Sequence, residues 1–149
     1  MKRKLSALLM CAAMFCCAAL PAQAYAAAAP EVEVVRTEHG DFTVETVLTV
    51  YPALSRAQTA RADKVQTVKY GGEVIAEVTL SATFGYDGDE AWVEEAESDY
   101  ETYDGWRYGS ERIRESGDTV SLSAKLSHAT EGTSSVNISM TCSPNGTIR

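Results

Sequence analysis

Apolar and polar residues alternate one by one along several segments of the chain. The longest such run extends from residue 74 to residue 86, where alternate positions hold Val74, Ala76, Val78, Leu80, Ala82, Phe84 and Tyr86. Successive side chains of a β-strand point to opposite faces, so this run predicts a long strand with one buried and one solvated face. The Gly71-Gly72 pair separates it from a second β-like run over residues 64–70. This pair predicts a tight hairpin, because both central positions of such a turn favour residues that adopt a positive φ.

The same alternation recurs on both sides of this hairpin. It covers, in chain order, residues 32–36, 42–50, 120–126 and 136–142. Residues 91–97 and 106–114 are less regular, but each segment follows an Asp-Gly turn, which is typical of β-hairpins. Ser143-Pro144-Asn145-Gly146 predicts the end of the last strand. We therefore expect an all-β domain of seven or eight antiparallel strands, arranged as a two-sheet Ig-like sandwich, with a small barrel as the alternative.

Residues 52–63 interrupt the β pattern. They are rich in alanine and arginine and contain few β-branched residues, and this composition disfavours a strand. Leu54, Ala57 and Ala60 fit the spacing of an amphipathic helix only in part. We expect a short helix or a solvated connection between two sheets in this segment.

The first residues follow the three-part pattern of an export signal. A positive start is followed by an apolar run over residues 5–20, by Pro21 and by the small residues of Ala22-Gln23-Ala24. The apolar run is shorter than the roughly 20 residues that a membrane span needs, which favours cleavage over an uncleaved anchor. We expect a signal peptide at residues 1–24, a flexible tether at residues 25–30 and one secreted domain at residues 31–149. Cleavage after Ala26 is the alternative to cleavage after Ala24.

Removal of this signal peptide makes the protein more acidic. The whole chain has 13 basic and 21 acidic residues and a formal net charge of −8. Residues 1–24 hold three of the basic residues and none of the acidic ones, so the remainder carries 10 basic residues against 21 acidic ones. This balance disfavours nucleic acid and anionic membrane surfaces as partners. A protein or a glycan outside the cell fits it better.

Removal of the signal peptide also leaves a single cysteine, Cys142, because the other three precede residue 24. A single cysteine excludes an intramolecular disulfide. Cys142 has the sequence parity of the apolar residues Val136 and Met140, which predicts a buried thiol. An intermolecular disulfide is the alternative.

Residues 87–104 form an unusually acidic segment. It contains nine acidic residues and no basic one: Asp87, Asp89, Glu90, Glu94, Glu95, Glu97, Asp99, Glu101 and Asp104. Calcium prefers such oxygen ligands, so Asp87, Asp89 and Glu90 are candidate ligands in a turn, although their spacing does not match an EF-hand loop. The alternative is a solvated hairpin whose charges prevent pairing with other sheet edges. No other cofactor is indicated.

Aromatic residues are interspersed with these acidic residues. Trp92, Tyr100 and Tyr103 are candidates for an exposed binding patch, because aromatic side chains anchor protein interfaces and stack on sugar rings. Trp92 shares its parity with Glu94, which predicts that it faces outward. The alternative is that the aromatic residues fill the core of the sandwich, as we expect for Trp106.

No catalytic signature is present in the sequence. The chain lacks a G-x-S-x-G motif, and its two histidines, His39 and His128, lie far apart in the sequence. We therefore expect a secreted, non-enzymatic domain that binds a protein or a glycan at or outside the cell surface. Two alternatives remain open, namely an extracellular structural or assembly subunit that uses its strand edges, and a small hydrolase with paired carboxylates.

Four features of the stretch from Lys64 to Gly146 resemble small secreted β-sandwich proteins of Gram-positive bacteria. They are the Tyr70-Gly71-Gly72 hairpin, the run Phe84-Gly85-Tyr86-Asp87-Gly88, Trp106 and the ending Thr141-Cys142-Ser143-Pro144-Asn145-Gly146. The resemblance implies a sandwich fold and secretion. It implies no activity, cofactor or site residue.

Overall fold

The computed structural model describes residues 28–53 and 58–149. Within these ranges the fold is all-β and contains no helix, so nothing in them has the length and apolar character of a membrane-crossing helix. The strands are β1 (Glu31–His39), β2 (Phe42–Tyr51), β3 (Thr59–Tyr70), β4 (Glu73–Tyr86), β5 (Ala91–Thr102), β6 (Arg107–Ser116), β7 (Thr119–His128) and β8 (Gly132–Thr141). The expected signal peptide lies outside the described residues, as does the tether up to residue 27.

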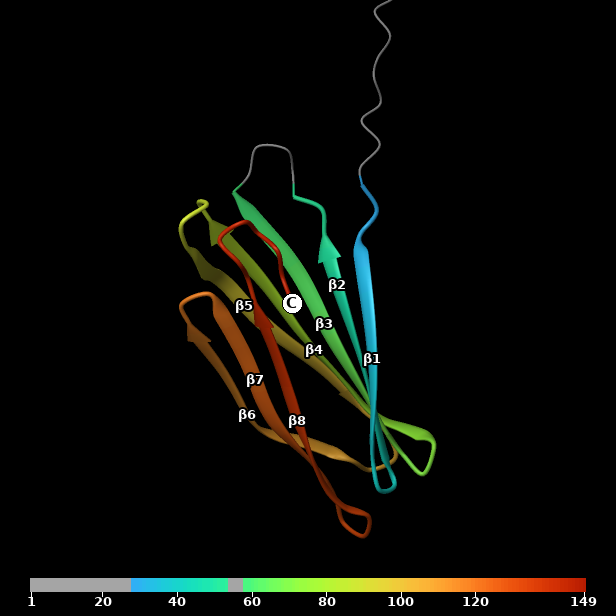
Figure 1. The fold of residues 1–149 in the computed structure, drawn as a ribbon. Helices are drawn as coiled ribbons and strands as arrows, with labels where there is room; N and C mark the ends of the chain where they lie inside the picture. The colour runs from blue at the N-terminus through green and yellow to red at the C-terminus, as the bar shows by residue number, and fades with distance from the viewer. Residues whose placement is uncertain (1–27, 54–57) are drawn as a thin grey trace, which may run out of the picture.

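The eight strands form two antiparallel sheets, which confirms the predicted all-β architecture of two sheets. The larger sheet has the order β1-β2-β3-β4-β5 and the smaller sheet has the order β6-β7-β8 (Figure 1). Every neighbour in a sheet is thus also a neighbour in the chain. An immunoglobulin sandwich instead has Greek-key connections that pass between its sheets several times. Here the described chain crosses once, between β5 and β6, so its connectivity differs from the expected Ig-like one.

The core lies between the two sheets and follows the alternation of the sequence. On β4 the side chains of Val78, Leu80 and Phe84 are fully buried, whereas Glu77, between Ala76 and Val78, is exposed. Burying a side chain of this size contributes about 1.5–3 kcal/mol, so this strand supplies a large part of the driving force for folding. We call the face of the larger sheet that points toward the smaller sheet its inner face, and the opposite one its outer face.

The prediction of a short helix or a solvated connection over residues 52–63 is wrong for the second half of this segment. Residues 59–63 belong to β3, where Ala60 and Ala62 are buried and Arg61 is exposed. Residues 59–63 all pair with β4, and residues 61–63 also pair with β2, so these backbone hydrogen bonds offset the weak strand preference of the segment. Leu54 and Ala57 lie outside the described residues.

The smaller sheet covers only part of the larger one. β8 packs across β3 and β4, β7 packs across β4 and β5, and β6 packs against β5. Within the described ranges, β1 and β2 contact no strand of the smaller sheet. Every residue of β1 is exposed. Three strands placed over five therefore leave the inner face of β1 and β2 without a covering strand.

The C-terminal tail, residues 142–149, covers one end of this gap. The predicted turn does end β8, but the chain then folds back along it. Thr141 and Arg149 exchange backbone hydrogen bonds of 3.0 and 3.1 Å, and Cys142 pairs with Ile148. Ile148 and Leu48 are both buried and belong to the same apolar cluster. The tail thus begins a fourth strand on the edge of β8 without extending along it.

Candidate functional site

Trp92 lies on the outer face of the larger sheet and is exposed, as predicted. It pairs with Gly85 of β4, and its indole ring lies directly over that glycine. A Cβ atom at position 85 would overlap the ring, so the missing side chain makes room for the tryptophan. One residue later the register between β4 and β5 shifts, because Val93 pairs with Phe84 and Glu95 pairs with Thr83. Glu94 is the extra residue of this bulge.

Tyr100 lies on the opposite face of the same strand. It pairs with Val78, whose side chain is buried between the sheets, so Tyr100 points to the inner face. Its ring stacks on Tyr108 of β6 at a centroid distance of 4.0 Å and an interplanar angle of 18°. Eight residues of β-strand separate Trp92 from Tyr100, a distance of roughly 26 Å. These two residues therefore do not share a binding site.

Tyr103 lies beyond the end of β5. Its backbone N–H donates to the carbonyl oxygen of Ile75 at 3.0 Å, and its hydroxyl donates to Glu101 Oε2 at 2.6 Å. Glu101 pairs with Glu77 of β4 on the outer face. The predicted patch of Trp92, Tyr100 and Tyr103 is thus divided among three places, although all three side chains are exposed.

The hydrogen bond to Glu101 leads to a pH-dependent prediction. It raises the pKa of Tyr103 from 10.0 to about 12. The folded protein therefore keeps a proton that the unfolded chain loses, and the resulting stabilisation is complete below pH 10 and is lost as the pH rises through about 12. We expect urea midpoints to fall more steeply across this range in the native protein than in Tyr103→Phe. Parallel curves for the two proteins would contradict the prediction.

In the acidic turn before β5, the carboxylate of Asp87 binds backbone groups of the turn itself. Asp87 Oδ1 accepts hydrogen bonds from the backbone N–H groups of Asp89, at 2.9 Å, and Glu90, at 2.8 Å. These bonds lower the pKa of Asp87 and form the local turn that aspartate favours. In the described part of the chain, no three acidic, histidine or cysteine side chains are grouped to hold a metal ion. The arrangement of Asp87, Asp89 and Glu90 therefore does not support the predicted calcium site.

The other acidic residues of β5 form a stripe on the outer face. Glu95, Glu97, Asp99 and Glu101 occupy alternate positions after the bulge, so all four share one face of the strand. We call these four residues the acidic stripe. Like charges spaced by two strand residues repel one another, and the stripe opposes the docking of another acidic surface on this face.

The side chains of His128 and Cys142 both pack against other parts of the fold. The imidazole of His128 packs against the ring of Trp106 at a centroid distance of 5.4 Å, and its Nδ1 accepts the backbone N–H of Glu131 at 3.2 Å. Cys142 is buried and free, which confirms the predicted core thiol, and its burial raises the pKa of the thiol.

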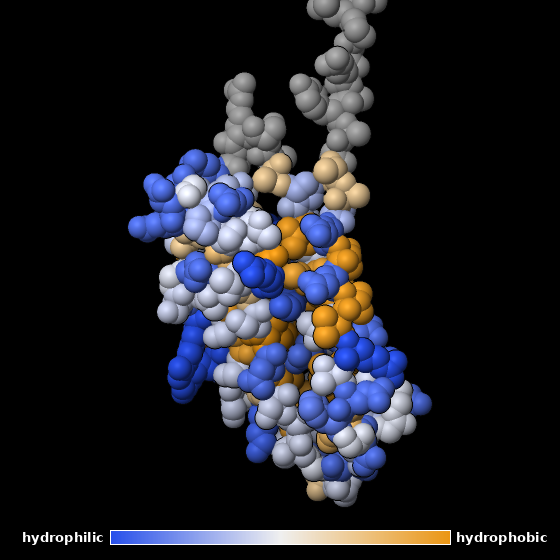
Figure 2. All heavy atoms as spheres, in the orientation of Figure 1, coloured by the Kyte–Doolittle hydropathy of each residue, from blue (hydrophilic) through white to orange (hydrophobic). Residues whose placement is uncertain are grey.

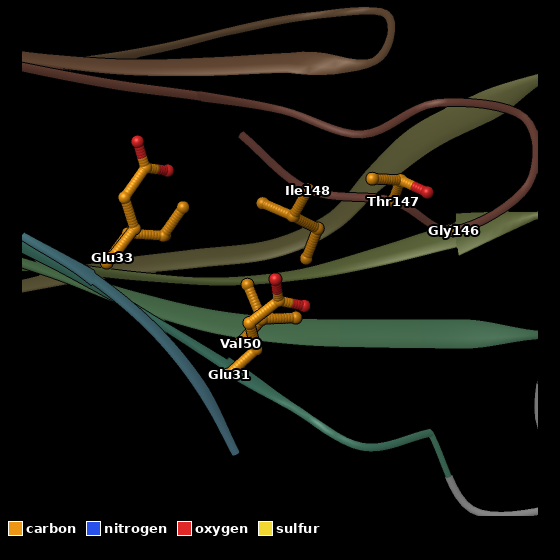
Figure 3. Close-up of a pocket in the computed structure, with 7 residues that line it drawn as sticks. Glu31, Glu33, Val50, Gly146, Thr147 and Ile148 are labelled. Carbon is orange, nitrogen blue, oxygen red and sulfur yellow. The ribbon is translucent and has the colours of Figure 1, made fainter.

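A groove lies on the inner face of β1 and β2, and sequence reasoning missed it. It has a volume of about 250 Å³ and is lined by Glu31, Glu33, Leu48, Val50, Gly146, Thr147 and Ile148. A second hollow of about 70 Å³ continues it and is lined by Glu33, Val35, Thr46, Leu48 and Lys64. Glu33 and Leu48 line both, so we treat the two as one groove. Figure 3 shows Glu31 and Glu33 rising from β1 on the side where Ile148 of the tail lies.

Side chains of β3 connect the groove to the nearby edge of β8. Lys64 of β3 donates from Nζ to the carbonyl oxygen of Ser139 at 2.8 Å, and Gln66 donates from Nε2 to that of Asn137 at 3.4 Å. Burial lowers the pKa of Lys64, and the charge of Glu33 partly offsets this effect. The groove thus combines an apolar floor with two carboxylates on β1, and it lies beside an edge of β8 that has no strand partner among the described residues.

One sequence signal pointed to this region. In the first strand Val34 and Val35 are adjacent, so apolar side chains occur on both faces of a segment that otherwise alternates. A strand that is apolar on both faces is normally buried, yet this one is an exposed edge strand. In Figure 2 apolar side chains accordingly reach the surface between the tail and β1.

Comparison with known proteins identifies no relative: no protein-family model matches the chain, and neither a curated protein nor a solved structure matches it.

Proposed function

We propose that this protein is a non-enzymatic, protein-binding domain that acts outside the cytoplasm and binds its partner through β1 and the adjoining groove. One observation carries the proposal. The side chains of Val32, Val34 and Val35 are 55%, 58% and 52% exposed on an edge strand. Val35 faces the groove and Val32 and Val34 face the opposite side, so the strand presents apolar side chains on both sides of its free edge. Concentrated exposed apolar side chains are typical of interaction sites.

The free edge of β1 supports binding to a protein. Among the described strands, β1 pairs only with β2, so its other edge offers a row of backbone groups without a strand partner over nine residues. Extended segments of other proteins bind to such edges by adding a strand. Charged residues on the strand, including the exposed pair of Arg36 and Glu38 at 3.2 Å, restrict unselective pairing and favour a partner of matching charge.

The distribution of aromatic side chains makes a glycan the weaker candidate ligand. A sugar ring stacks on an exposed aromatic ring, and specific recognition combines several such contacts. Trp92 lies on the outer face over Gly85, whereas Tyr100 faces inward and stacks on Tyr108. The three candidate residues therefore offer separate contacts, and the protein-binding alternative is favoured.

Glu31 and Glu33 are the paired carboxylates that the alternative function, a small hydrolase, would require. They lie on one face of β1 at a spacing of roughly 7 Å, which is within the range of inverting glycosidases. A catalytic carboxyl pair, however, is normally enclosed in a cleft, and both residues are exposed in an open groove. Binding is thus the better explanation of this pair.

Site-specific photo-crosslinking in the producing cell tests the proposal. A photoreactive residue replaces Val34 on the edge strand, and in a matched control it replaces Glu97 of the acidic stripe. We expect a discrete protein adduct from position 34, found outside the cytoplasm, and none from position 97. The absence of an adduct from position 34, equal labelling from both positions or retention in the cytoplasm would contradict the proposed function.

A further inference from the structure

We propose that the groove binds an extended polypeptide segment with apolar and basic side chains, which joins the smaller sheet as a strand at the free edge of β8. This inference rests on the proposed function and names the chemistry of the partner. The edge of β8, the C-terminal tail, the partly open floor and the charge of the groove support it.

Among the described strands, β8 pairs only with β7, so its edge beside the groove has no strand partner, although two of its carbonyl oxygens accept hydrogen bonds from side chains of β3. The carbonyl oxygens of Asn137 and Ser139 point away from β7, because side chains of β3 donate to them. In an antiparallel strand the N–H and C=O groups of one residue point to the same side. The N–H groups of Asn137 and Ser139 therefore also face the groove and are available to an added strand.

The C-terminal tail shows that this edge accepts a strand. The reciprocal hydrogen bonds between Thr141 and Arg149, together with the pairing of Cys142 with Ile148, are those of an antiparallel neighbour. Gly146, Thr147 and Ile148 also line the groove. A bound segment would continue the interface that the tail begins, along residues 133–139 of β8.

The floor of the groove needs such a cover. β8 lies over β3, and strands within a sheet are about 4.8 Å apart, so a strand added to β8 would lie over β2. The inner face of β1 and β2 presents the exposed Val35 and the partly buried Val50 there, beside Leu48, which is already buried. Alternate side chains of the added strand would point to this floor. Apolar residues at those positions would bury it between two sheets.

The charge of the groove selects basic side chains. Glu31 and Glu33 stand along the β1 side, and within the lining residues Lys64 is the single cation. Its Nζ is already hydrogen-bonded to Ser139 of β8. The whole chain carries a net charge of −8, which adds a long-range attraction for a basic segment. Lysine or arginine side chains of the partner would reach over the strand edge to Glu31 and Glu33.

Binding of a designed peptide to the whole protein tests this inference. The probe is a labelled peptide of about seven residues in which valine and lysine alternate, a length that spans the groove side of β8. Its controls are a valine–glutamate peptide and a valine–lysine peptide that is N-methylated at alternate residues, so that its charge is kept and its strand pairing is blocked. We expect both controls to bind at least about tenfold more weakly in fluorescence anisotropy.

Variants of the protein separate the groove from general electrostatic attraction. We expect Glu33→Gln to weaken the valine–lysine peptide by about threefold to tenfold, and Glu97→Gln, an equal loss of charge in the acidic stripe, to change its affinity by less than about twofold. Amide exchange at Asn137 and Ser139 should slow on binding. Equal effects of the two variants, equal binding of the N-methylated peptide or unchanged exchange would overturn the inference.

The crosslinking and peptide-binding experiments together distinguish this inference from the proposed function on which it rests. A protein adduct from position 34 without peptide binding would retain the proposed function and remove this partner chemistry. Protection of the β8 edge that appears with protein concentration alone, without peptide, would identify a second copy of the chain as the occupant and would also overturn the inference.

Discussion

Replacement of Phe84 by alanine is expected to lower the free energy of unfolding by about 3–5 kcal/mol. Phe84 is fully buried near the C-terminal end of β4, and it is among the largest of the completely enclosed side chains. The substitution removes the apolar surface of the ring and leaves a cavity that the rigid strands on either side cannot close. Such a loss is a large fraction of the 5–15 kcal/mol that stabilises a typical domain.

Urea unfolding followed by tryptophan fluorescence measures this effect. Glu77→Gln is the matched control, because Glu77 is an exposed residue of the same strand and its substitution should change stability by less than about 0.5 kcal/mol. Phe84→Leu keeps most of the volume and should lose about 1–2 kcal/mol, which provides a measurable variant if Phe84→Ala does not fold. A loss below about 1 kcal/mol in Phe84→Ala would mean that the ring is not enclosed between two sheets.

Replacement of Gly146 by alanine is expected to lower the free energy of unfolding by about 2–4 kcal/mol. Gly146 has a φ of +79°, which is unfavourable for residues that carry a Cβ atom. In addition, a Cβ atom at this position would lie 2.6 Å from the ring of Tyr86. The tail would have to shift, and with it Ile148, which lines the groove.

The two contributions can be separated. Gly88 has a φ of +99° and free space around its Cα atom, so Gly88→Ala carries the backbone strain alone and should lose about 1 kcal/mol. Combining Gly146→Ala with Tyr86→Leu should recover part of the loss in a double-mutant cycle, because the ring is the obstacle. Equal effects of Gly88→Ala and Gly146→Ala would contradict the close approach of Tyr86.

The consequences of these two substitutions for binding differ. Phe84 lies in the core that both sheets share, so its loss affects every element. Gly146 acts on the tail, which pairs with the edge of β8 and lines the groove. A substitution there should therefore alter peptide binding at the groove even under conditions in which the domain stays folded.

The candidate site was only partly predictable from the sequence. The exposure of Trp92 followed from its parity with Glu94, but that parity does not continue to Tyr100, because Glu94 is the extra residue of a bulge. A bulge is set by the partner strand and reverses the faces of all residues beyond it. The division of Trp92 and Tyr100 between two faces was thus decided by pairing with β4.

The alternation of apolar and polar residues determined the number, the type and most of the bounds of the strands. This information is local, since two-residue periodicity and the glycines at turns such as Gly71-Gly72 act within a few residues. Local information also fixed the burial of Trp106 and Cys142.

Tertiary structure alone decided the rest. Residues 59–63 became a strand because two neighbours pair with them, and the tail folded back because β8 offered an unpaired edge. The groove exists because five strands pack against three, which leaves the inner face of β1 and β2 uncovered. Such features depend on contacts between residues far apart in the chain, whose energies no short segment of sequence contains.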